Sequence, residues 1–439
     1  MTDAQTSGEM LPGLLKVAER ARRDPEGKFN SLAHLMDEEA LTRAYRRLRK
    51  TAAPGVDGLT VEQYGQNLEE NIRSLLQRMK AMKYRHQPVK RVLIPKDGGK
   101  TRPIGISATE DKIVQGAIAE VLQAIYEQDF LESSYGFRPK KSAHDAIRAL
   151  NQAAQAGEVN WLLEADIQSF FDSIDRKLLR EMLQLRVVDG SMHRLIGKCL
   201  HVGILEGEEF ARPEVGTVQG SILSPLLGNI YLHYALDVWF EKEVRPRLAG
   251  KAVLVRYADD FVIGFERKDD ADRVMAVLGK RMGKYGLTLH PDKTRLLPFG
   301  KPGGKKEARE SPSTFDFLGF TFYWRRTEKG GWVVRCKTRR ARLARAIKAV
   351  GEWCRRHRHH SIKEQHAALR SRIQGHFNYF GVSGNLANLS SLNHWAARAW
   401  YKWLKRRSQR TRLNWERFRD LLRDFPLPRP RVVVKLGVR

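Results

Sequence analysis

The sequence predicts an α+β protein whose last third is entirely helical. Apolar runs of strand length alternate with helical patterns up to about residue 335. Beyond about residue 337 the chain becomes basic, helical in its apolar spacing and rich in aromatic residues. The chain also carries 79 Lys and Arg against 50 Asp and Glu, a formal net charge of +29. These three features indicate a mixed core followed by a basic helical domain.

The first third begins with basic helices and continues with a hairpin. Residues 1–50 are polar, basic and helical in pattern, and we expect them to form an N-terminal extension. Apolar runs at 91–95 and 101–106 flank an Asp-Gly-Gly-Lys turn, which predicts a β-hairpin. Two helical patterns follow near 109–128 and 141–156.

Acidic residues stand where the strands of the middle third end. An apolar run at 161–165 ends at Asp166, which opens the sequence Asp-Ile-Gln-Ser-Phe-Phe-Asp. Two further apolar runs are separated only by Asp259 and Asp260, which predicts a hairpin with an acidic turn. The remaining helical patterns lie at 221–244 and 269–285, and the remaining strand patterns at 252–258, 261–265, 315–323 and 331–335.

Charge and cysteine content limit the class of protein. The large positive charge favours a polyanionic partner such as nucleic acid, because neutralised phosphates release counterions. A membrane surface is the alternative partner. No apolar stretch could span a bilayer and the polar N-terminus has no signal-peptide pattern, so we expect a cytoplasmic protein. Cys199, Cys336 and Cys354 lie far apart, which argues against disulfides and against a cysteine zinc site.

Carboxylates at rigid strand ends suit nucleotidyl transfer with two metal ions. That reaction needs divalent cations held about 3.5–4 Å apart, and Mg²⁺ prefers hard oxygen ligands. Asp166, Asp259 and Asp260 offer such oxygens, and two adjacent carboxylates are costly to bury without a cation beside them. Taken singly, the acidic pair is equally typical of a solvated turn, and Asp166 of a helix cap. We interpret Asp172 as a cap or a structural acid.

The ordered motifs resemble those of reverse transcriptases, in particular the enzymes encoded by bacterial group II introns. Segments 166–172 and 257–260 resemble motifs A and C of this family, and 216–232 resembles its motif B. Segments 133–139 and 102–106 match two further motifs. The resemblance extends from about residue 30 over nearly the whole chain. It implies an RNA-directed DNA polymerase with a right-hand fold of fingers and palm, followed by a basic helical thumb.

The resemblance also implies a metal site. Asp166, Asp259 and Asp260 would be the catalytic metal ligands, assisted by the backbone carbonyl of Ile167. The expected cofactor is a pair of Mg²⁺ ions, for which Mn²⁺ could substitute.

Further residues are expected to bind the nucleotide and the primer. The residues expected at the nucleotide are Lys96, Arg102, Phe171, Gln219, Gly220 and Lys293. Lys96 and Arg102, in the fingers, would bind the triphosphate. The Phe171 ring would exclude a ribose 2′-hydroxyl. Lys293 would act near the pyrophosphate as a general acid. The residues expected to form the primer grip are Phe317, Leu318 and Gly319.

Each of these residues has an ordinary structural alternative. The alternative for Phe171 is ordinary core packing. Solvated hairpin charges are the alternative for Lys96 and Arg102, although they fit Lys100 better than these two. Lys293 is also typical of a surface lysine, and 317–319 of a plain buried strand.

Five parts of the chain are expected from the resemblance. They are an N-terminal extension at 1–50, fingers at 51–150, a palm at 151–335, a thumb or maturase domain X at 336–405 and a short basic DNA-binding-like segment at 406–439. Segment 374–385 resembles the maturase signature, and basic residues of 337–425 form the expected RNA-binding surface. We expect most aromatic residues there to pack between helices. We expect no Cys/His-rich endonuclease module.

The expected function is that of an RNA-directed DNA polymerase that binds a group II intron RNA and assists its splicing. It would support retrohoming by target-primed reverse transcription. Its partners would be intron and template RNA, a DNA primer or target, and dNTPs. Three alternatives stay open: a splicing-only maturase, a domesticated enzyme of phage defence, CRISPR-linked adaptation or DNA repair, and an RNA-dependent RNA polymerase. The intact acids argue against the first, and Phe171 argues against the last.

Overall fold

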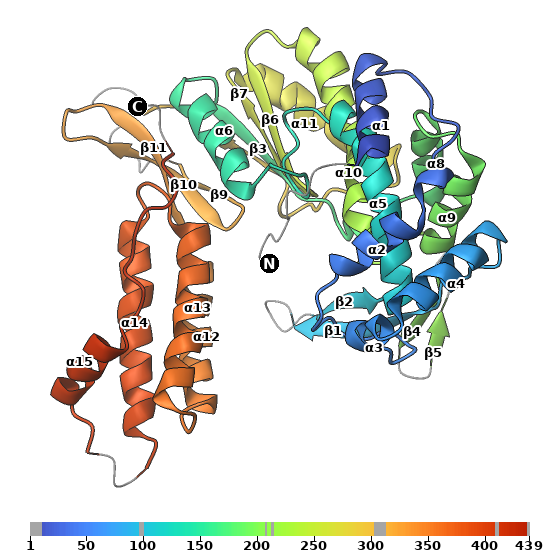
Figure 1. Cartoon of the computed structure of the whole chain (residues 1–439). Coiled ribbons are helices and arrows are strands. Elements are labelled where there is room, and N and C mark those ends of the chain that lie inside the picture. The colour runs from blue at the N-terminus through green and yellow to red at the C-terminus, as the bar shows by residue number, and fades with distance from the viewer. Residues whose placement is uncertain are drawn as a thin grey trace.

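The structure, a computed structural model, describes residues 11–95, 101–206, 209–211, 215–302, 313–408 and 412–436. Helices and strands are mixed, as the sequence predicts, and the described strands form three separate sheets. Figure 1 shows a bent molecule, with a helical C-terminal arm on one side, the N-terminal hairpin on the other and a central sheet between them.

The central sheet carries the acidic strand ends. Its strand order is β6-β7-β3-β8, and every neighbouring pair is antiparallel. The strands are β3 (Trp161–Ala165), β6 (Ala252–Tyr257), β7 (Asp260–Phe265) and β8 (Arg295–Pro298). Side chains alternate between the two faces: Leu163 and Ile263 enter one core, and Leu162 and Val262 enter another. Because both faces are buried, the strand ends are held rigidly.

Helices cover both faces of this sheet. α6 (Ala143–Gln155) packs on β6, and α11 (Lys268–Gly283) packs on β3 and β7 from the other side. α5 (Thr109–Asp129) is buried along most of its length and contacts α1 (Pro12–Arg23) and α2 (Glu38–Arg46). The remaining helices before α5 are α3 (Val61–Gly65) and α4 (Leu68–Lys80).

A second sheet contains the predicted N-terminal hairpin. β1 (Val89–Pro95) and β2 (Thr101–Ile106) pair antiparallel, which confirms the predicted strand pairing, while the predicted turn at 97–100 lies outside the described residues. β1 also pairs in parallel with β4 (Ile204–Glu206), a partner that the sequence did not indicate. β5 (Glu209–Ala211) extends the sheet beyond β4. The helices between β3 and β4 are α7 (Phe170–Ser173), α8 (Arg176–Gln184) and α9 (Gly190–Leu200).

The segment predicted to be helical at 221–244 does not form one regular α-helix. The prediction of a continuous helix is wrong there, because the type of helix changes along the segment. α10 (Ser224–Leu232) ends early, and π-helical turns follow at His233–Asp237 and Phe240–Val244. Apolar residues are buried both in α10 and in the π-helical turns. The burial pattern therefore continues, while the backbone hydrogen bonds span five residues instead of four.

The single strand predicted at 315–323 is also wrong, because a turn divides it. β9 (Phe315–Phe317) and β10 (Phe320–Arg326) pair antiparallel across Leu318 and Gly319. These two residues have φ values of 50° and 82°, as a type I′ hairpin turn requires. β11 (Trp332–Thr338) pairs with β10 and completes the third sheet.

The C-terminal arm is helical, as predicted. Its helices are α12 (Arg340–Arg356), α13 (Ile362–Phe380), α14 (Leu386–Lys405) and α15 (Trp415–Asp424). They share a core that contains Ile373, Phe377 and Trp400. The domain boundaries expected at 150 and 335 fall inside α6 and β11, so neither coincides with a loop.

Two composition-based expectations can be compared with the structure. All three cysteines are buried as free thiols. Among the helices of the described residues, none combines the length and the apolar content needed to cross a bilayer.

Candidate active site

The three acids expected to bind metal come together at one end of the central sheet. β3 and β7 pair with Ala165 opposite Phe261, so the next residues, Asp166 and Asp260, follow in the same register. Residues opposite each other in an antiparallel pair have Cβ atoms about 4.5–5.5 Å apart. Asp259 lies in the two-residue turn between β6 and β7, directly before Asp260.

The acids interact electrostatically. Desolvation, followed by the negative charges of Asp259 and Asp166, raises the pKa of Asp260 to about 6. The cations Lys293 and Arg342 oppose this rise. Asp260 is exposed as a whole residue, whereas its carboxyl group is desolvated. Like charges that interact in this way are relieved by a bound divalent cation.

Lys293 lies beside the acids rather than on a distant surface. Its Nζ is 2.5 Å from Oδ2 of Asp166. The chain before Lys293 runs along the end of β3, where the amide of His290 donates to the carbonyl of Asp166 at 2.7 Å. Ile167 forms a β-bridge with Leu289 at the same place. This local pairing carries Lys293 to the acidic cluster.

The donor set has the chemistry for a hard divalent cation but is not preassembled. Within the part of the chain that the structure describes, no three Asp, Glu, His or Cys side chains stand in a metal-binding arrangement. Asp166 is engaged with Lys293, and Ile167, whose carbonyl was expected to assist, is 3% exposed. Carboxylate oxygens are ligands that Mg²⁺ prefers. The residue types therefore fit the metal, while the side chains would have to rearrange to hold it.

Two arginines of the N-terminal hairpin lie near the segment that follows β3. Desolvation raises the pKa of Asp172, and the positive charges of Arg91 and Arg102 lower it. Arg102 is exposed on β2, where the sequence placed it. Arg91 of β1 was not predicted to lie here. Its place on the strand that pairs with β2, which carries Arg102, could have indicated it. Lys96 lies outside the described residues.

The turn at 219–220 packs against β2. The amide of Gly105 donates to the carbonyl of Gln219 at 2.8 Å. Gly220 has a φ of +105°, and a Cβ there would lie 2.7 Å from the Gly105 carbonyl oxygen. The structure therefore explains this glycine by the close approach of β2, whereas contact with a nucleotide stays a prediction.

The two phenylalanines of α7 differ in burial. Phe170 is 3% exposed and belongs to the core, as expected. Phe171 is only partly buried, and its ring lies 5.2 Å from that of Phe170. A Cβ on Gly228 would lie 2.9 Å from Phe170 and 3.2 Å from Phe171, so α10 packs closely beneath both rings. Phe171 thus keeps part of its surface exposed to solvent.

The segment expected to form the primer grip is the turn between β9 and β10. Phe317 is buried, whereas Leu318 and Gly319 form the turn itself. The hydroxyl of Tyr379 donates to the carbonyl of Leu318 at 2.9 Å, and the amide of Arg339 donates to the carbonyl of Gly319 at 2.9 Å. The turn is therefore fixed by the C-terminal arm, which begins at that point.

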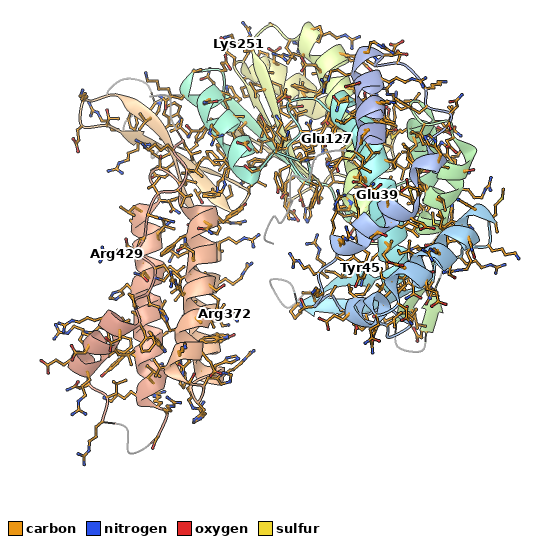
Figure 2. All side chains as sticks on the ribbon, viewed as in Figure 1. Glu39, Tyr45, Glu127, Lys251, Arg372 and Arg429 are labelled. Carbon is orange, nitrogen blue, oxygen red and sulfur yellow. The ribbon has the colours of Figure 1, made fainter. Side chains whose placement is uncertain are left out.

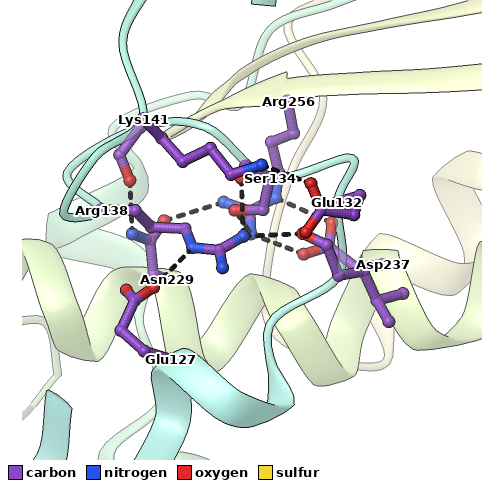
Figure 3. A network of polar contacts seen from close by, with 10 residues as sticks. Glu127, Glu132, Ser134, Arg138, Lys141, Asn229, Asp237 and Arg256 are labelled. Carbon is purple, nitrogen blue, oxygen red and sulfur yellow. Dashed lines mark hydrogen bonds and ion pairs between the residues drawn. The ribbon is translucent and has the colours of Figure 1, made fainter. Parts of the chain in front are cut away.

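A buried polar network lies directly behind the acidic turn, and sequence reasoning missed it. Arg256, the residue before Tyr257, is paired with Asp237 in the core. Figure 3 shows this pair beside Ser134 and Asn229, with Arg138 and Glu127 next to them. The available signal was one arginine in an otherwise apolar strand and one aspartate in a mostly buried helical segment.

The C-terminal arm exposes basic side chains together with some aromatic rings. Figure 2 shows how densely its side chains, including Arg372 and Arg429, are placed. The guanidinium of Arg372 lies 5.2 Å from the centre of the Trp353 ring. On α14, Trp395 is 49% exposed and Arg398 lies over it at 5.8 Å, whereas Trp400 is fully buried. The aromatic residues therefore divide between core packing and the surface.

Comparisons with known proteins identify sequences that are similar to this chain. Residues 94–322 match the family model described as reverse transcriptase (RNA-dependent DNA polymerase). The protein YkfC of Escherichia coli (strain K12) is 33% identical over 316 residues, which cover 64% of this chain and 83% of YkfC.

The names of two further relatives refer to introns. The group II intron-encoded protein LtrA of Lactococcus lactis subsp. cremoris is 33% identical over 243 residues, 54% of this chain and 40% of LtrA. An uncharacterized 91 kDa protein in the cob intron of Schizosaccharomyces pombe is 35% identical over 314 residues, 60% of this chain and 38% of that protein. The matched part thus spans less than half the length of either relative.

Proposed function

The chain belongs to the reverse transcriptase family, in the branch of group II intron-encoded proteins, and we propose that it extends a DNA primer along an RNA template. The proposed catalytic residues are Asp166, Asp259 and Asp260. The observation that carries this proposal is the strand register, which aligns Asp166 with Asp260 beside the turn that holds Asp259. The raised pKa of Asp260 supports it in part: desolvation is the larger cause, and the negative charges of Asp259 and Asp166 add to it.

The chain's own residues account for binding and orientation. When bound, a pair of Mg²⁺ ions would activate the primer 3′-hydroxyl and stabilise the departing pyrophosphate, and Mn²⁺ could substitute. Arg102, with Lys96, would bind the triphosphate through charge-assisted hydrogen bonds. Lys293, already beside Asp166, would donate a proton to the leaving group. The turn at Leu318 and Gly319 would hold the primer strand.

The test of this function is primer extension on an RNA template with dNTPs and Mg²⁺. We expect Asp259→Ala to abolish extension, because a carboxylate that should hold the metal is lost. The matched control is Asp272→Ala, which removes an exposed acid of α11 that pairs only with Lys268 among the ion pairs of the described residues. Full extension by the Asp259 variant would refute the proposed mechanism.

A second measurement separates DNA synthesis from RNA synthesis. Phe171 is only partly buried, and we propose that its ring excludes the ribose 2′-hydroxyl. Phe171→Ala should raise the preference for rNTPs over dNTPs, as a ratio of kcat/KM, by more than about tenfold. Phe170→Leu is the control, because its ring belongs to the core. Efficient rNTP incorporation by the wild-type chain would indicate an RNA polymerase instead.

We also propose that the chain binds a group II intron RNA, assists its splicing and supports retrohoming by target-primed reverse transcription. The names of its intron-encoded relatives favour this function. The observation that favours it in the structure is the basic C-terminal arm with exposed rings such as Trp395. Basic residues interleaved with exposed rings suit an RNA backbone and unstacked bases.

A splicing assay distinguishes the remaining alternatives. Addition of the chain to a group II intron RNA at low Mg²⁺ should accelerate splicing, and Asp259→Ala should retain that effect while losing extension. A chain that accelerates splicing without extension would be a splicing-only maturase. A chain that extends primers without any effect on splicing would be a domesticated enzyme of the kind found in phage defence, CRISPR-linked systems or DNA repair.

A further inference from the structure

A fully buried cation stands directly before the acidic turn. Arg256 is the fifth residue of β6 and is 0% exposed, in the otherwise apolar sequence Ala-Val-Leu-Val-Arg-Tyr. A buried guanidinium is very costly unless it is paired and hydrogen-bonded. The partners of Arg256 therefore determine how the end of β6 is held.

Those partners use all five N–H donors of the guanidinium. Nε donates to Oδ1 of Asp237 at 2.8 Å, and Nη2 donates to Oδ2 of Asp237 at 2.5 Å and to Oγ of Ser134 at 2.7 Å. Nη1 donates to Oδ1 of Asn229 at 2.9 Å and to the carbonyl oxygen of Ala258 at 3.0 Å. Because the guanidinium is planar and rigid, five bonds fix its position (Figure 3).

The last of these bonds reaches the turn itself. Ala258 has a φ of 57°, a left-handed conformation that costs a residue with a side chain about 1–2 kcal/mol. Such a conformation persists only where the surroundings determine it. The segment at 133–139 lies against the turn, since a Cβ on Gly136 would be 2.3 Å from the amide nitrogen of Ala258. Asn229 binds that segment too, donating to the carbonyl of Gly136 at 2.7 Å.

The π-helical turn explains how one helix supplies two partners. Asn229 and Asp237 are eight residues apart, which in a regular α-helix would place them about 80° apart around the axis. The π turn at His233–Asp237 holds more residues per turn, and the amide of Val238 bonds to the carbonyl of His233. The wider turn reduces the angle, so both side chains reach Arg256.

We propose that Arg256 is a positioning residue, whose guanidinium fixes the Ala258 carbonyl and with it the orientation of Asp259 and Asp260. The inference rests on the proposed polymerase function. The alternative is that the pair with Asp237 serves folding alone. Buried ion pairs often stabilise a protein no more than an apolar pair of similar size, so the two roles can be separated.

The test replaces both partners at once. Arg256→Met combined with Asp237→Leu removes the pair without leaving a buried charge. We expect the Tm to stay near the wild-type value, while kcat for single-nucleotide addition falls about 10²-fold, because small displacements of reacting groups have effects of that size. We expect the KM for dNTP to change little. The affinity for Mn²⁺, measured by calorimetry without nucleotide, should fall as well.

A second buried ion pair, formed by residues outside the central sheet, provides the matched control. Arg186 and Asp129 are 3% and 9% exposed, and Arg186 also donates to the carbonyls of Ala21, Asp24 and Gly27. Arg186→Met combined with Asp129→Leu should leave kcat and the Mn²⁺ affinity at wild-type values, whatever its effect on the Tm.

Arg256→Lys keeps the test decisive if the double variant does not fold. It retains the charge, but an ammonium has three donors and no planar fork. A loss of kcat and Mn²⁺ affinity at the wild-type Tm supports the proposal. Wild-type kcat and Mn²⁺ affinity in the lysine variant or in the folded double variant would overturn it. An inactive wild-type chain would instead count against the proposed polymerase function.

Discussion

At the scale of single residues, the ammonium group of Lys293 lies where it would compete with a metal ion for the acids. Its Nζ lies 2.5 Å from Asp166. We expect Lys293→Met to bind Mn²⁺ more tightly, because the competing cation is removed. The same variant should add nucleotides more slowly, by about 10²-fold or more, because a general acid is lost.

Calorimetry with Mn²⁺ and single-nucleotide extension check the two effects separately. Lys280→Met removes an exposed lysine of α11 and is the control for charge alone. Weaker Mn²⁺ binding in the Lys293 variant would contradict this account of the ion pair.

Gly220 provides a second prediction at this scale. Its φ of +105° and the 2.7 Å approach of a Cβ to the Gly105 carbonyl leave no room for a side chain. Gly220→Ala should therefore lower both the Tm and the rate of extension. Gly279→Ala is a matched change within α11, where a Cβ would meet no atom within 4 Å. Thermal unfolding should show that variant stabilised by about 0.5–1 kcal/mol, and an unchanged Tm in the Gly220 variant would contradict the packing argument.

Sequence reasoning succeeded for residues whose neighbours in the chain reveal their place. Asp166 and Asp260 could be placed because apolar strands lead to them, and the register aligns them. Arg256 could not be placed, since its four partner residues come from three separate parts of the chain. Nothing local to β6 shows that an aspartate in a distant π turn compensates its charge.

At the scale of elements, α14 presents a mixed surface. Trp395, Arg398 and Lys402 are exposed and lie three and four residues apart, on one face of the helix. Trp395→Ala should weaken RNA binding by about 1–3 kcal/mol, the value of one stacked base, and should leave the Tm unchanged. Filter binding of an intron RNA gives the first quantity. Trp400→Leu should lower the Tm and leave RNA binding unchanged, because Trp400 is fully buried. If the Trp395 variant bound RNA as tightly as the wild-type chain, this face of α14 would be excluded as the contact.

Some elements could be predicted and others could not, for identifiable reasons. The hairpins at β1–β2 and β6–β7 follow from apolar runs separated by short polar turns. The π turns after α10 were missed because burial continues through them while only the hydrogen bonding changes. The break between β9 and β10 was missed because Leu318, an apolar residue, adopts a left-handed conformation in the turn.

At the scale of the whole molecule, the charge of +29 dominates encounters with nucleic acid. If six or more phosphates are contacted, affinity for RNA should fall about 10³-fold or more between 50 and 200 mM salt. Fluorescence anisotropy across that range measures the slope. A flat salt dependence would show that binding does not involve the basic surface.

The arrangement of the large parts was less accessible from the sequence than their content. A mixed core and a helical basic arm could be predicted from composition and periodicity. The parallel pairing of β1 with β4 could not, because it joins segments more than a hundred residues apart. The same holds for the packing of α6 on β6 and β11, which lie far from it in the sequence.

The central claim is that Asp166, Asp259 and Asp260 hold a pair of metal ions at the end of the central sheet. Electron paramagnetic resonance of Mn²⁺ bound to the chain with template, primer and an unreactive nucleotide analogue tests it most directly. We expect a spin-coupled pair of ions about 3.5–4 Å apart, which the Asp260→Asn substitution abolishes. Isolated, uncoupled Mn²⁺ in the wild-type complex, or a coupled pair that survives Asp260→Asn, would contradict it.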